Sequence, residues 1–124
     1  MSDEQIRIAI AESVGWLNIE RYLGTDKVKF QGVLKGNPEL LSLVEIPNYP
    51  NDLNAMHEVE KTQIQPLGIY PEHYAAKLME IIPRRETTVS GQRTSHMSHY
   101  FDLIHATARQ RAEAYLRVKG LWKE

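Results

Sequence analysis

The segment 84–95 combines residues that could bind a phosphate group. It contains three arginines and five serine or threonine residues, with Gly91 between them. Arginine offers paired N–H donors to a phosphate, and hydroxyl groups together with backbone N–H groups complete an anion site. The alternative is a solvated hairpin after a helix C-terminus, where arginines also suit the helix dipole. The residues assigned to a phosphate-bearing ligand, including an aromatic ring to stack on a base, are Arg84, Arg85, Thr87, Thr88, Ser90, Arg93 and Tyr100.

The loop 47–52 is a second candidate site, because its two prolines, Pro47 and Pro50, fix the backbone angle φ at both positions. A rigid loop loses little conformational entropy on binding, so the loop is predicted to form an edge for a partner. The competing interpretation is structural: the loop begins a helix over 51–62, with Asn51 as its N-cap and Tyr49 packed against the first turn. The residues assigned to the partner edge are Asn48, Tyr49, Asn51 and Asp52.

The sequence carries no pattern typical of catalysis. Its five histidines lack the spacing of a metal site, which needs three or four converging ligands. Nucleophile motifs, phosphate-binding P-loops and dinucleotide fingerprints are missing. With no cysteine, the chain has no thiol nucleophile, disulfide or thiolate metal site. We therefore expect no enzyme activity, no metal and no cofactor.

The charge balance bears on the class of partner. Fifteen Lys and Arg residues against sixteen Asp and Glu residues give a net charge of −1, so nothing attracts the whole chain to nucleic acid. The cations Arg109, Arg111, Arg117 and Lys119 are interpreted as a solvated helix face. No apolar run is long enough to span a membrane, and the acidic N-terminus differs from a signal peptide. We expect a cytoplasmic protein.

Helices are expected at both ends of the chain, whose 124 residues are the size of one domain. Ser2 opens a capping box ahead of a helix over 3–14. Thr107 opens a second capping box ahead of the last helix. That helix is predicted to end in a Schellman motif, with Gly120 in the left-handed conformation.

The middle of the chain mixes extended and helical patterns. Two β-favouring runs within 17–34 predict a hairpin, and Pro71 fits the first position of another helix. The segments 86–90 and 100–105 are predicted as strands, with a helix over 97–104 as the alternative for the second. The sequence therefore predicts an α+β fold in which a small antiparallel sheet is flanked by helices, like an α/β/α sandwich, in a single domain spanning residues 1–124.

Three segments together resemble the phage ABA-sandwich domain family. They are 8–16, which ends in Gly-Trp, 46–60, which contains the pattern Pro-x-Tyr-x-x-Asp, and 106–116, which is rich in Arg, Ala and Glu. The chain has Met56 and His57 where the family usually has a tryptophan. The resemblance implies an α/β sandwich and a phage source, and it implies no reaction.

The expected function is that of a small phage-encoded accessory protein. It would bind a host macromolecule, such as an immune or regulatory protein, and inhibit it without catalysis. One alternative is a small-ligand binder that sequesters a phosphate-bearing nucleotide immune signal. Another is a nucleic-acid-binding module, although the net charge and the lack of a reader motif argue against it. A second copy of the chain stays open as a partner.

Overall fold

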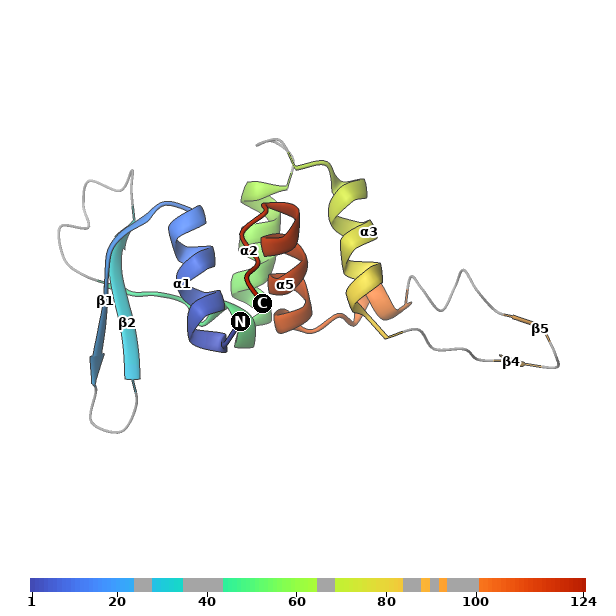
Figure 1. Cartoon of the computed structure of the whole chain (residues 1–124), viewed down its shortest axis with the longest axis horizontal. Helices are drawn as coiled ribbons and strands as arrows, with labels where there is room; N and C mark the ends of the chain where they lie inside the picture. Colours follow the sequence, from blue (N-terminus) through green and yellow to red (C-terminus); the bar gives the residue numbers. More distant parts are fainter. Residues whose placement is uncertain (24–27, 35–43, 65–68, 84–87, 90–91, 94–100) are drawn as a thin grey trace.

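The computed structural model describes residues 1–23, 28–34, 44–64, 69–83, 88–89, 92–93 and 101–124. Its helices lie in a row, with the strands β1 and β2 at one end and the pair β4 and β5 at the other (Figure 1). A helical turn over 101–104 precedes the last helix. The elements are α1 (Asp3–Ser13), β1 (Trp16–Leu23), β2 (Val28–Leu34), β3 (Val44–Glu45), the 3₁₀ turn η1 (Tyr49–Asn51), α2 (Leu53–Gln63), α3 (Pro71–Ile81), β4 (Thr88–Val89), β5 (Gln92–Arg93) and α5 (Ala108–Val118).

The first and last helices begin as predicted, each with a complete capping box. The backbone N–H of Gln5 donates to the Ser2 hydroxyl at 3.2 Å, and Gln5 Oε1 accepts from the Ser2 backbone at 2.8 Å. Thr107 and Gln110 repeat this exchange at 3.1 and 2.9 Å. Each exchange satisfies N–H groups that a helix start leaves unpaired. Local sequence therefore determines where α1 and α5 begin.

The predicted hairpin is confirmed by β1 and β2, which pair antiparallel, and β3 adds a short third strand. The register shifts between Leu17 and Glu20, so β1 carries a bulge opposite Gly32. A Cβ atom at Gly32 would lie 3.0 Å from the carbonyl oxygen of Leu17. A glycine therefore allows the close approach of β2 to the bulge.

The core lies mainly between helices. The helix α5 packs against α1, α2 and α3, and its Tyr115 and Leu116 are fully buried together with Ile6, Ile10 and Met56. Among the described elements, α1 is the helix that contacts the sheet, through β1. The predicted sheet with helices on both faces is therefore not shown. What the structure shares with that prediction is a small domain of helices with short antiparallel strands.

The predicted strand over 100–105 is wrong where the structure describes it. Residues 101–104 are helical, and the N–H of His105 donates to the carbonyl of Phe101 at 3.0 Å, the spacing of an α-helix. Arg111 binds two carbonyls at the end of this turn, at 3.0 and 3.1 Å. Arg111 thus pairs carbonyls that a helix C-terminus leaves without a partner. The local sequence does not predict this contact.

The helix predicted over 51–62 begins two residues later than expected, because η1 precedes it. The backbone N–H of Asn51 donates to the carbonyl of Asn48 at 2.9 Å within that turn. Asp52 is therefore the N-cap, and its carboxylate accepts from the N–H of Ala55 at 3.2 Å. The helix predicted from Pro71 is confirmed as α3. None of the described helices is long and apolar enough to cross a membrane.

Candidate functional site

The predicted phosphate site is described only in part. The strands β4 and β5 pair antiparallel with Thr88 opposite Arg93, and Figure 1 shows this pair at a distance from the helices. The segment 86–90 is thus extended at residues 88–89, with β5 as its partner. Its role in binding phosphate stays a prediction. The assigned residues Arg84, Arg85, Thr87, Ser90 and Tyr100 lie outside the described residues.

The predicted partner edge at residues 47–52 divides into buried and exposed parts. Tyr49 is only 5% exposed, and its hydroxyl accepts a hydrogen bond from Trp16 Nε1 at 3.2 Å. Burial raises the pKa of Tyr49, which keeps the phenol neutral. Asn48, Asn51 and Asp52 are exposed. Tyr49 therefore holds the loop in place, and only the other three side chains face solvent.

The loop also joins α1 to α2. The side-chain amide of Asn51 donates to Asp3 at 3.3 Å and to the Asn48 side chain at 3.1 Å. The guanidinium of Arg7 on α1 donates to the carbonyl of Pro47 at 3.2 Å and also to the carbonyl of Ile46. Burial lowers the pKa of Arg7. These contacts support the structural interpretation of the loop.

The solvated face predicted for the last helix is wrong for Arg111, which is only 7% exposed. Arg111 pairs with Glu60 of α2 at 3.1 Å. Arg109 pairs with Asp3 at 2.6 Å. Arg117 pairs with Glu113 on the same helix. The carboxylates that bind these arginines reduce the positive charge that α5 presents to a polyanion.

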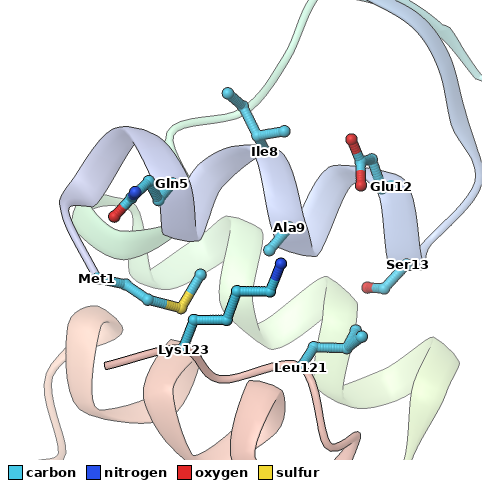
Figure 2. A pocket seen from close by; sticks show the side chains of 8 residues that line it. All are labelled: Met1, Gln5, Ile8, Ala9, Glu12, Ser13, Leu121 and Lys123. Atoms are coloured by element: carbon cyan, nitrogen blue, oxygen red, sulfur yellow. The ribbon is translucent and has the colours of Figure 1, made fainter.

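A hollow of about 480 Å³ lies between α1 and the C-terminal tail, and we call it the α1–tail groove (Figure 2). Its lining is mostly apolar, through Met1, Ile8, Ala9 and Leu121, with ionic groups from Glu12 and Lys123. Among the described residues, those that line the groove are Met1, Gln5, Ile8, Ala9, Glu12, Ser13, Leu121 and Lys123.

One wall of the groove is placed by the Schellman motif that ends α5. Gly120 has φ of +73°, and the N–H of Leu121 donates to the carbonyl of Leu116 at 2.8 Å, as predicted. The tail then runs back along α1. The guanidinium carbon of Arg117 lies over the ring of Trp122, 5.0 Å from the centroid of that ring. Leu121 and Lys123, the neighbours of Trp122, line the groove.

The opposite wall is the half-exposed side of α1. Its other side carries Ile6 and Ile10 into the core. At its C-terminal end, the Ser13 hydroxyl lies 2.8 Å from the hydroxyl of Tyr115 on α5. At its N-terminal end, the carbonyl of Met1 accepts from Arg109 at 3.3 Å. Side-chain hydrogen bonds therefore fix both ends of this wall.

Sequence reasoning did not find the groove. The one local signal is Ile8, an apolar residue that lies off the stripe of Ile6, Ile10 and Val14. Nothing in the local pattern shows that the tail returns to this face of α1, since that depends on how α5 packs. The groove is therefore a finding of the structure.

The two ionic groups of the groove are the Glu12 carboxylate and the Lys123 ammonium. Within the described ranges, neither of these side-chain groups has a hydrogen-bond or ion-pair partner. No group of three or more His, Cys, Asp or Glu side chains gathers as a metal site among the residues described. The groove thus offers apolar surface with one negative and one positive charge.

Comparison with known proteins adds no relative to this picture. No family model, no curated protein and no solved structure matches the chain.

Proposed function

We propose that the chain is a non-enzymatic binding protein of phage origin. It acts in the cytoplasm of the host cell, where it docks on a host defence or regulatory protein and inhibits it. The observation that carries this proposal is the α1–tail groove. The sequence adds the absence of catalytic motifs and the resemblance to small phage proteins.

The chemistry of the groove supports a protein as the partner. Sites for proteins combine a central apolar surface with a polar rim. Here Ile8, Ala9 and Leu121 supply apolar surface, and Gln5, Glu12 and Lys123 supply polar groups. The net charge of −1 gives no general attraction to a polyanion.

The rigidity of the walls supports binding as well. The capping box at Ser2 fixes the start of α1, and the turn at Gly120 fixes the start of the tail. A site whose walls are already ordered loses less conformational entropy when a partner arrives. The groove is therefore suited to docking without rearrangement.

The test blocks the groove with Ala9→Arg and compares it with Ala76→Arg. Ala9 lies in the middle of the α1 wall, and Ala76 is an exposed residue of α3, a helix of the same length. Arginine is a good helix former, so both variants should fold. Circular dichroism and thermal unfolding check this. Leu121→Asp is a second groove variant, on the other wall.

Host proteins retained by each immobilised variant are quantified by mass spectrometry. We expect the partner to be retained equally by wild type and Ala76→Arg, and at least tenfold less by Ala9→Arg and Leu121→Asp. Equal retention by the groove variants, or no specific protein retained by wild type, would overturn the proposal. The identified partner is then assayed with the purified chain. An unchanged activity would refute the inhibitory role.

A further inference from the structure

The α1 wall of the groove has the spacing of a helix-packing surface. Its lining residues Gln5, Ile8, Ala9 and Glu12 stand at positions i, i+3, i+4 and i+7. Four residues at this spacing surround the hole that receives one side chain of a facing helix in knobs-into-holes packing. Ala9 is the smallest of the four, so its side chain fills the least of the hole. This arrangement points to a helical occupant.

We infer that the groove binds an amphipathic α-helix of the partner, which packs along α1 with a basic residue near Glu12 and an acidic residue near Lys123. The inference rests on the proposed function and names the chemistry of the partner at the same site. It adds two requirements: a helical pattern of apolar side chains and a defined order of charges.

The length of the wall fits two turns of a helix. From Gln5 to Glu12 the axis of α1 rises by about 10 Å. A partner helix covers the same length with apolar side chains at i, i+3 or i+4, and i+7, the usual pattern of a helix bound in a groove. Met1, which precedes α1, and Leu121 of the tail complete the apolar surface, so aliphatic side chains suit the hole.

The charges of Glu12 and Lys123 determine where the charged residues of that helix lie. Glu12 stands near the C-terminal end of α1, and Lys123 projects from the tail across Ala9 (Figure 2). A charge that loses water without gaining a partner opposes binding. Opposite charges on the occupant prevent this loss, and complementary charges mainly determine specificity and orientation.

The test uses a displayed library of random peptides, selected on the full chain. We expect enriched peptides with apolar residues at helical spacing, flanked by one basic and one acidic residue. Selection is repeated on the double variant Glu12→Lys with Lys123→Glu, whose folding is checked by thermal unfolding. The two charged positions of the enriched peptides should exchange sign. Peptides from the first selection should bind this variant at least tenfold more weakly.

Ala9→Arg and Ala76→Arg distinguish this inference from the proposed function. Peptides lost on Ala9→Arg and kept on Ala76→Arg bind in the groove. If such peptides show alternating or proline-rich patterns, or keep their charges on the double variant, the helical occupant is wrong while groove binding stands. Peptides that bind Ala9→Arg as well as wild type, or no enrichment at all, would overturn the inference.

Discussion

The buried Arg111 and the partly buried Glu60 form an ion pair that joins α5 to α2. The guanidinium donates two hydrogen bonds to the carboxylate, at 3.1 and 3.2 Å. Arg111 also donates to the carbonyl of Ala106 at 3.1 Å and to two carbonyls of the helical turn over 101–104. Tyr74 of α3 lies beside the pair. A single arginine thus connects the segments around the core.

Removal of the carboxylate should destabilise the fold strongly. Glu60→Ala leaves the guanidinium of Arg111 buried without its anion, a change that costs about 3 kcal/mol of unfolding free energy in comparable pairs. Urea denaturation of the wild type and of Glu60→Ala measures the difference in unfolding free energy. The control is Glu58→Ala on the same helix, whose pair with Lys61 is exposed and should contribute less than about 0.5 kcal/mol. Equal effects of the two substitutions would contradict the role of Arg111.

Two buried tyrosines differ in whether the hydroxyl has a partner. Tyr115 shares a hydrogen bond with Ser13 at 2.8 Å, whereas the hydroxyl of Tyr74 lies beside the Glu60 and Arg111 side chains without a hydrogen bond of ordinary geometry to the described residues. Tyr115→Phe should cost about 1 kcal/mol, and Tyr74→Phe should be neutral or stabilising, because it removes a buried group without a partner. Urea denaturation at neutral pH shows which of the two variants loses more unfolding free energy. A larger loss for Tyr74→Phe would show that its hydroxyl is paired.

What the sequence predicted well depends on neighbouring residues. Ser2 and Thr107 act on N–H groups three residues away, and Gly120 acts through its own backbone angle. These signals predicted the boundaries of α1 and α5. The alternation of side chains in 17–34 likewise predicted a hairpin.

What could not be predicted depends on residues far apart in the chain. Arg111 reads as one cation of an exposed set until Glu60, on another helix, is placed beside it. The N-cap of α2 is Asp52 and not the predicted Asn51, because Asn51 belongs to the 3₁₀ turn that precedes the helix. The α1–tail groove needs the packing of α5, which no local pattern contains. The sequence therefore predicts the two segments that form the walls of the groove, but not that they lie side by side.

The fold should lose stability at alkaline pH. Burial raises the pKa of Tyr115, and burial with the nearby Glu60 carboxylate raises the pKa of Tyr74. Below about pH 10 the phenols are neutral in both states. Above it the unfolded chain ionises first, so the free energy of unfolding falls as pH rises toward the folded pKa values. Urea midpoints between pH 8 and 11 measure this, and Tyr74→Phe should show a smaller decline. An identical decline would refute the contribution of Tyr74.

Gly120 should be sensitive to substitution for conformational reasons alone. A Cβ atom there meets nothing within 4 Å, yet the residue holds φ of +73°. A side chain in this left-handed region costs about 1 kcal/mol, so Gly120→Ala should lower the free energy of unfolding by that amount in urea. Asparagine tolerates this conformation better, and Gly120→Asn should lose less than half as much. Because the same turn directs Leu121 into the groove, Gly120→Ala should also weaken binding of a groove ligand while Gly120→Asn retains it. Equal stability of the two variants would mean that the chain leaves α5 by a different turn, and that the tail does not form the second wall of the groove.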